Sequence, residues 1–222
     1  MIATYDQFCR EVDQRGALLF SGTSGCPVHL GALTEPDQWH TDEVSDPWQW
    51  KDRIAAEGRA AYGRFFAKGA LGFISLQTLP YFLSLRAGAR QLRDAYWMGQ
   101  VDETCMRCYE ALEGEPLATH ELRARLGLPG KKRHVLDRAL TQLQARMLIT
   151  GAGTRRRMDA MGLPTGWPGT LMSTFEQWAP AALERAEALD PARVGADLLD
   201  ALCARNPTVP RETWAALIGT DF

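Results

Sequence analysis

The chain has 222 residues, of which 45% are hydrophobic and 23% charged, and its formal net charge is −2. This balance is typical of a globular protein and excludes a disordered chain, a collagen-like repeat and a small disulfide-stabilised peptide. A chain of this length can bury a core without disulfide bonds or bound metals. The overall charge is too small to mark the whole molecule as a polycation or as an acidic tail.

The first twenty residues contain early acidic side chains and no continuous apolar segment, so we expect no signal peptide. Every apolar stretch falls short of about 18 residues, which predicts no membrane span. The cysteines are odd in number and lack the spacing of a disulfide framework, which favours free thiols and a cytoplasmic location. They are Cys9, Cys26, Cys105, Cys108 and Cys203.

Hydrophobic periodicity and turn residues predict the following elements in the first half of the chain. In order, we expect a helix over 5–14 that ends at Gly16, a strand over 17–20, a long Gly, Ser and Pro-rich loop, a helix that begins at Asp46 and Pro47, a hairpin with strands 61–66 and 71–75, and a helix or turn around Leu79, Tyr81 and Phe82.

The second half has mainly helical patterns. We expect helices over 103–113, over 119–126 with Thr119 as its cap, and over 131–147, then a strand over 148–150 and a tight turn at Gly151-Ala152-Gly153. The Pro and Gly-rich segment 161–169 should form a rigid connection anchored by Trp167, and 173–219 should be mostly helical with a break at 206–210.

A helix, a short helix, a longer helix and then a two-stranded ribbon is the order of a winged helix, in which the third helix enters the major groove of DNA. Charge supports this interpretation. Residues 117–157 contain ten basic and two acidic side chains, whereas the rest of the chain contains 15 basic and 25 acidic ones. A local positive surface favours contact with phosphates, because neutralising them releases condensed counterions.

We therefore predict that the chain contacts double-stranded DNA through the start of the third helix and through the wing. The predicted contact residues are Lys131, Lys132, Arg133, Arg138, Arg155, Arg156 and Arg157. Two alternatives remain open, since basic runs are often solvated faces and winged helices can also bind a protein partner. Three consecutive arginines also cannot all point to one face of a strand.

Three segments carry a resemblance to a known family: DPWQWKDRIAAEG, then FISLQTLPYFLSLR with its Leu-Pro-aromatic element, then EALEGEPLATHELRARLGL. Together they resemble the AlkZ/YcaQ-type winged-helix DNA glycosylases, and more closely the smaller AlkZ-related bacterial proteins. The pattern is carried by Trp48, Trp50, Leu79, Pro80, Tyr81 and Phe82. The resemblance implies winged helices that cradle duplex DNA and excise alkylated or crosslinked bases.

The larger enzymes of that family carry a Gln-aliphatic-Gln or Gln-aliphatic-Asp motif in an N-terminal region. The early glutamines of this chain, which do not fit that motif, are Gln7, Gln14, Gln38, Gln49 and Gln77. We therefore expect this chain to lack the motif, and the family's catalytic assignment is not transferred to it. A DNA-binding relative without the chemistry, or one that uses other groups, fits better.

An acidic and aromatic segment is the other place where chemistry could occur. Carboxylates beside aromatic rings can act as acid or base, and aromatic rings can stack on an unpaired base. The candidate pocket residues are Trp39, His40, Asp46, Trp48, Trp50, Lys51 and Asp52. The alternative is a Trp-rich core with a capped helix, in which these residues are structural.

The pair Cys105 and Cys108 shares one helix face and could hold a metal, but zinc needs four ligands and the other Cys and His residues lack suitable spacing. Packing of both thiols in the core is the alternative that we prefer. The chain also lacks a phosphate-binding loop and a dinucleotide fingerprint. We therefore expect neither a metal nor a cofactor.

In sum, the sequence predicts an α+β, mainly helical protein with three parts: an N-terminal αβ part over 1–100, a winged helix over 101–160, and a linker with C-terminal helices over 161–222. The leading hypothesis is a cytoplasmic bacterial DNA-binding protein related to the winged-helix glycosylases. The alternatives are a base-excision enzyme that uses an acidic residue such as Asp46 or Asp52, and a protein-interaction module.

Overall fold

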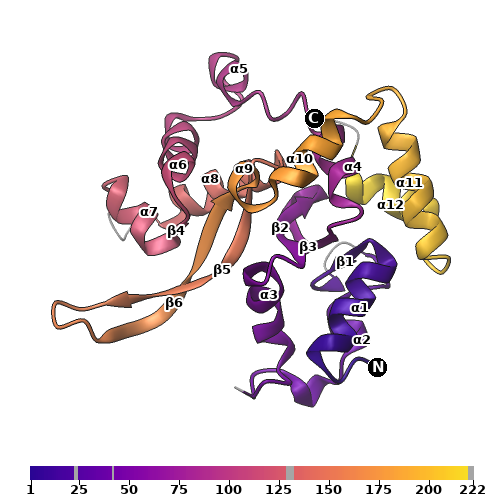
Figure 1. The fold of residues 1–222 in the computed structure, drawn as a ribbon, viewed down its shortest axis with the longest axis horizontal. Coiled ribbons are helices and arrows are strands. Elements are labelled where there is room, and N and C mark those ends of the chain that lie inside the picture. Colours follow the sequence, from indigo (N-terminus) through magenta and orange to yellow (C-terminus); the bar gives the residue numbers. More distant parts are fainter. Residues whose placement is uncertain (23–24, 42, 129–132, 220–222) are drawn as a thin grey trace.

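A computed structural model describes residues 1–22, 25–41, 43–128 and 133–219 of the chain (Figure 1). The predicted α+β class is confirmed. Within these residues the chain forms twelve α-helices and one antiparallel sheet of six strands, in the order β1-β3-β2-β5-β6-β4. The sheet therefore joins strands from the N-terminal part to strands from the middle of the chain.

The N-terminal part begins with a helix whose ends are set by local chemistry. The Thr4 hydroxyl accepts a hydrogen bond from the backbone N–H of Gln7, and Gly16 ends the helix with a φ of 76°. The predicted helix start at Asp46 and Pro47 is also confirmed. The elements of this part are α1 (Tyr5–Arg15), β1 (Ala17–Leu19), α2 (Leu30–Leu33), the 3-10 helix η2 (Pro36–Gln38) and α3 (Pro47–Ala56).

The predicted hairpin follows α3, and its second strand lies between β1 and β2 in the sheet. Alternate side chains of a strand point to opposite faces. Leu18 and Phe73 accordingly pack with α1 and α3, whereas Ala61 and Ile74 pack with helices from the C-terminal part. The elements are β2 (Ala60–Phe66), the 3-10 helix η3 (Ala67–Gly69), β3 (Ala70–Ser75), α4 (Leu79–Leu85) and α5 (Leu92–Trp97).

The middle of the chain forms its own apolar core, built around Leu122, Leu136 and Leu143. One expectation is wrong in detail, because Ala118 is the cap of α7 and Thr119 is its first helical residue. The Glu121 carboxylate accepts the backbone N–H of Ala118 at 2.7 Å instead. The elements are α6 (Glu103–Gly114), β4 (Leu117–Ala118), α7 (Thr119–Arg125), α8 (Arg133–Ala145), β5 (Ile149–Met158) and β6 (Pro164–Thr174).

The hairpin of β5 and β6 differs from the sequence prediction in two places. Residues 151–153 form no turn, because they lie within β5, at a bulge between the pairs Gly151–Met172 and Thr154–Thr170. Residues 161–169 form no connection to the C-terminal helices, because they make the end of this hairpin and most of β6. Trp167 is consequently no anchor, since 91% of its surface is exposed.

The C-terminal helices cover the face of the sheet opposite to α1 and α3 (Figure 1). The predicted helical tail and its break are confirmed. The buried Asn206 holds the break by donating hydrogen bonds to the carbonyls of Leu202 and Arg15. The helices are α9 (Phe175–Trp178), α10 (Pro180–Glu187), α11 (Val194–Arg205) and α12 (Arg211–Ile218). Within the described ranges no helix is both long and apolar enough to span a membrane.

Candidate nucleic-acid interface

The outer part of the β5–β6 hairpin projects from the body of the protein (Figure 1). Its inner part lies between α3 and α7, and two glycines allow it to approach both helices closely. A Cβ atom at Gly153 would lie 2.9 Å from the Cβ of Ala56 on α3. A Cβ atom at Gly169 would lie 2.8 Å from the Nδ1 atom of His120 on α7. Both contacts depend on the absence of a side chain, and Gly153 also has a φ of +114°, which favours glycine.

The three consecutive arginines of β5 divide between the two faces of the hairpin. Arg156 lines a cleft that faces α3. Arg157 lines a cleft that faces α7, and Arg155 forms an ion pair with Glu121 of α7, with an N–O distance of 2.8 Å. This division follows from the alternation of side chains along a strand. The hairpin therefore presents cations on both faces and not on one.

A second bulge places Trp167 at the edge of the hairpin. Arg155 pairs with Gly169 and Arg157 pairs with Thr165, so the three residues from Gly166 to Pro168 lie opposite Arg156 alone. Bulges of this kind redirect side chains and are tolerant of Pro and Gly. The indole of Trp167 is directed out of the sheet as a result, and it borders both clefts.

The cleft between α3 and the hairpin has a volume of about 510 Å³. Trp48, Asp52 and Arg53 of α3 line it from one side, and Arg156 and Trp167 line it from the hairpin. Two indoles, the guanidinium group of Arg156 and one carboxylate therefore border the same space, whereas the Arg53 guanidinium pairs with Glu57 and lies over the ring of Tyr5. Indoles can stack on a base, and guanidinium groups can pair with phosphates.

Asp52 is an acidic residue that lines this cleft, and the pKa of its side chain is raised. Burial raises the pKa of its carboxyl group, and the ammonium group of Lys51, 2.6 Å away, counteracts this effect. Lys51 also lies over the ring of Trp48, with its Nζ atom 4.6 Å from the ring centre. The carboxyl group of Asp52 therefore stays protonated to a higher pH than an ordinary aspartate does.

The other predicted pocket residues lie outside the cleft. Asp46 is buried and caps α3, since one carboxylate oxygen accepts the backbone N–H of Trp48, and its other oxygen accepts the backbone N–H of Thr41. Trp50 is 1% exposed and stacks on Phe8 in the core. These two residues are structural, as the alternative interpretation of this segment expects.

Trp39 and His40 do not line the cleft, and their rings lie next to each other, with His40 beside Trp48. The indole N–H of Trp39 donates to the hydroxyl of Thr34 at 2.9 Å, and its ring packs edge-on against Phe20. The exposed ring of His40 has its centre 5.3 Å from that of the Trp48 ring. The backbone of His40 adopts a φ of 62°. Of the predicted pocket, the structure thus brings Trp48 and Asp52 into the cleft, with Lys51 and His40 beside Trp48.

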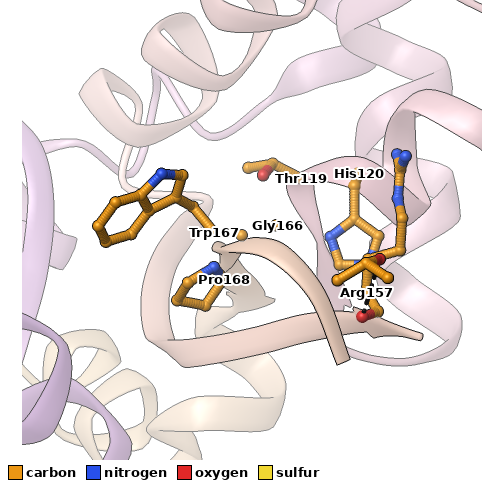
Figure 2. Close-up of a pocket in the computed structure, with 8 residues that line it drawn as sticks. Thr119, His120, Arg157, Gly166, Trp167 and Pro168 are labelled. Atoms are coloured by element: carbon orange, nitrogen blue, oxygen red, sulfur yellow. Dashed lines mark hydrogen bonds between the residues drawn. The ribbon is translucent and has the colours of Figure 1, made fainter. Parts of the chain in front are cut away.

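The cleft on the α7 side has a volume of about 490 Å³. Figure 2 shows the ring of His120 and the side chain of Arg157 on one side of the hairpin, with the indole of Trp167 extending away from them. Thr119 lines the same space. Neither His120 nor Thr119 is among the residues predicted to make contact, and no motif in the sequence distinguishes them.

Of the remaining predicted contact residues, the structure describes the side chain of Arg138, which lines neither cleft. Arg138 of α8 forms an ion pair with Asp102, which begins α6. Lys131 and Lys132 lie outside the described residues, and so does the side chain of Arg133. Of the predicted contact residues whose side chains are described, those of β5 therefore lie on the hairpin that borders the two clefts.

The expectation that the chain lacks a Gln-aliphatic-Gln or Gln-aliphatic-Asp tripeptide is wrong for the chain as a whole. Gln100-Val101-Asp102 and Gln142-Leu143-Gln144 both fit the pattern. The structure uses these side chains for other contacts. Asp102 caps α6, and the amide of the buried Gln144 bonds to the backbone of Leu140 and Arg64. Neither tripeptide lines either cleft, so the family's catalytic assignment is still not transferred.

The two cysteines of the CxxC pair lie in the core. Cys105 and Cys108 are fully buried beside Leu112 on α6, and burial raises the pKa of each thiol to about 12. They therefore pack as small apolar side chains. No group of three or more metal-binding side chains occurs in the described part of the chain.

These features define a class of α+β protein with a projecting basic hairpin and an aromatic cleft at its base. A family model described as "AlkZ related" matches residues 2–219. The chain therefore belongs to the AlkZ-related family, as the resemblance predicts, and the match extends over almost its whole length. No curated protein and no solved structure matches it.

Proposed function

We propose that this protein binds double-stranded DNA through the β5–β6 hairpin and the cleft between the hairpin and α3. The observation that carries the proposal is the projecting hairpin with Arg155, Arg156 and Arg157 in one strand. Membership of a family named after a DNA glycosylase supports a role in DNA repair. The protein would act in the cytoplasm, where its thiols stay reduced.

We also propose that residues 103–174 form a winged helix. The order α6-β4-α7-α8-β5-β6 supports this, and so does the pairing of β4 with β6. In this arrangement α8 is the third helix and the hairpin is the wing, which contacts the DNA backbone. Contacts by Lys131, Lys132 and Arg133 at the start of α8 stay a prediction. The proposed winged helix extends past residue 160, because β6 completes the hairpin.

The test is salt-dependent binding of a short duplex, followed by fluorescence anisotropy. The logarithm of the binding constant should fall linearly with the logarithm of the salt concentration, with a slope of about −0.9 for each phosphate contacted. Replacing Arg155, Arg156 and Arg157 together by Ala should weaken binding at low salt and make the slope shallower. Arg156 and Arg157 should contribute more than Arg155, which pairs with Glu121.

A matched control replaces arginines that are far from the hairpin in the sequence. Arg193 and Arg211 pair with acidic side chains of α11, and changing both to Ala should leave the slope unchanged. Absence of binding at low salt would contradict the proposal. An unchanged slope in the triple variant would contradict the part assigned to the hairpin.

A second candidate function is base excision, and the position of Asp52 favours it. This carboxyl group lies in the cleft with two indoles that could hold an unstacked base, and burial raises its pKa. A carboxylic acid that stays protonated can donate a proton to a departing base, and its ionised form can activate water. We assign no such role to Asp46, because one of its oxygens caps α3 through the backbone N–H of Trp48 and the other accepts the backbone N–H of Thr41.

Incubation with an alkylated duplex, followed by detection of abasic sites, tests this candidate. The wild-type protein should release the base and Asp52→Asn should not, whereas Asp37→Asn, at an exposed position in η2, should behave as the wild type. No release above the blank by the wild-type protein would reject base excision and leave the binding proposal intact.

A further inference from the structure

The end of the β5–β6 hairpin is a turn with a defined hydrogen-bond network. One carboxylate oxygen of Asp159 accepts the backbone N–H of Met161 at 2.8 Å and that of Leu163 at 2.9 Å. The backbone N–H of Asp159 donates to the carbonyl of Leu163 at 2.9 Å, and Gly162 adopts a φ of 77°. We call residues 158–163 the hairpin tip. The backbone of the hairpin tip is fixed by the side chain of Asp159 and not by packing against the body of the protein.

The hairpin tip exposes large apolar side chains to solvent. Met161 is 84% exposed and Leu163 is 57% exposed, and Met158 is also exposed. Exposed apolar clusters of this kind mark interaction surfaces more often than isolated apolar residues do. A fixed turn that presents Met and Leu outward is therefore suited to insertion into an apolar environment.

The charges next to the tip indicate which environment this is. Arg156 and Arg157 lie on opposite faces of the strand that leads into the tip. The negative charge of Asp159 is offset by the two N–H groups that it accepts. A complementary partner would therefore carry negative charge on both sides of the hairpin tip and would offer an apolar interior to Met161 and Leu163. Duplex DNA has this chemistry, with two phosphate backbones outside and stacked bases between them.

We propose that the hairpin tip inserts Met161 and Leu163 between stacked base pairs of the bound duplex, and that Arg156 and Arg157 contact the phosphates of the two strands. This proposal rests on the proposed DNA binding and goes beyond it. Apolar wedges of Met, Leu or Phe unstack base steps in this way and kink the duplex. The tip would thereby open the stack next to the cleft that contains Trp48 and Trp167.

The experiment uses duplexes with 2-aminopurine at single positions, because its fluorescence rises when the base is unstacked. Wild-type protein at saturating concentration should raise the fluorescence at one or two adjacent positions. The double variant Met161→Ser/Leu163→Ser should lose this rise and bind the duplex about tenfold more weakly. The control is Met98→Ser, since Met98 is 65% exposed but lies after α5, outside the hairpin. It should match the wild type in both measurements.

The outcomes separate this inference from the proposed function. If the wild-type protein binds no duplex at low salt, both fail. If it binds but leaves 2-aminopurine fluorescence unchanged at every position, insertion is wrong and DNA binding stands. A parallel measurement uses vesicles of anionic phospholipid. Binding to vesicles that the double variant loses, together with wild-type DNA binding by that variant, would overturn insertion and assign the tip to a membrane surface.

Discussion

Trp48 of α3 and Trp167 of β6 line one cleft, although one comes from the N-terminal part and the other from the hairpin. Trp48 is 45% exposed and packs edge-on against Phe20, whereas Trp167 is almost fully exposed. Two accessible indoles in one cleft are suited to stacking on an unpaired base.

Trp167→Ala should weaken binding to a duplex with one unpaired base by about 1–3 kcal/mol, because stacking of a base on an aromatic ring contributes about this much. Binding to a fully paired duplex should change less. The matched control is Trp97→Ala, which removes an exposed indole from α5. Binding is measured by fluorescence anisotropy. The assignment would be contradicted if Trp97→Ala lost as much binding free energy as Trp167→Ala, or if Trp167→Ala lost as much with the paired duplex as with the unpaired base.

The raised pKa of Asp52 predicts a specific dependence of stability on pH. The folded protein holds the Asp52 proton more tightly than the unfolded chain, so the contribution of Asp52 to stability falls as the pH rises from about 3.8 through the raised pKa. Asp52→Asn lacks this titration. Urea unfolding curves between pH 3.5 and 7 give the free energy of unfolding of both proteins. The value for the wild type minus that for the variant should decrease as the pH rises. A constant difference would show that the pKa is not raised.

Asp102 should have the opposite dependence. Burial disfavours its ionised form, but hydrogen bonds from the Arg138 guanidinium and the backbone N–H of Cys105 outweigh burial and lower its pKa. Its stabilising contribution is therefore complete above the ordinary pKa of 3.8 and is lost as the pH falls through the lowered pKa. Wild type and Asp102→Asn should accordingly converge in stability at low pH.

Two variants of Asp102 separate its two contacts. Asp102→Asn keeps a side chain that can cap α6 and loses only the exposed ion pair with Arg138, so it should cost at most about 0.5 kcal/mol at pH 7. Asp102→Ala also removes the cap and should cost about 1 kcal/mol more. Urea unfolding measures both. Equal costs for the two variants would mean that the cap contributes nothing.

The buried thiols should be protected from alkylation in the folded protein. The thiolate is the reactive form, and burial raises the pKa of Cys105 and Cys108 to about 12. Brief treatment with iodoacetamide at pH 8 should label Cys203, which is half-buried, before either of them. Peptide mass spectrometry measures which cysteine is labelled first, and unfolding in urea should remove the difference between the cysteines. Rapid labelling of Cys105 without urea would contradict the packing described.

The fold could be predicted from the sequence where local signals and tertiary packing agree. Asp46 and Pro47 begin α3 because a capping carboxylate and a proline suit the first turn of a helix. The hairpin of β2 and β3 follows from aromatic and β-branched runs around Lys68 and Gly69. In these segments the residues that favour an element are also those that bury its apolar face.

Residues 151–174 could not be predicted in the same way, because the pairing of β5 with β6 overrides local preference. Gly153 indicates a turn by itself, and Pro168 disfavours a strand, yet both are accommodated at bulges. The one local signal was Asp159, three residues before Gly162, which is typical of a turn between two strands. The sequence predicts a two-stranded ribbon here but places its turn at 151–153, so it assigns Trp167 to a connecting segment and not to the cleft.

Gly153 lets β5 approach α3 closely at Ala56, because it leaves free the space in which a Cβ atom would lie 2.9 Å from the Cβ of Ala56. Trp48, Arg156 and Trp167 line the same cleft but take no part in that close approach. Descendants of this sequence could thus acquire new ligand preferences by drift at the lining positions, provided that they keep glycine at position 153.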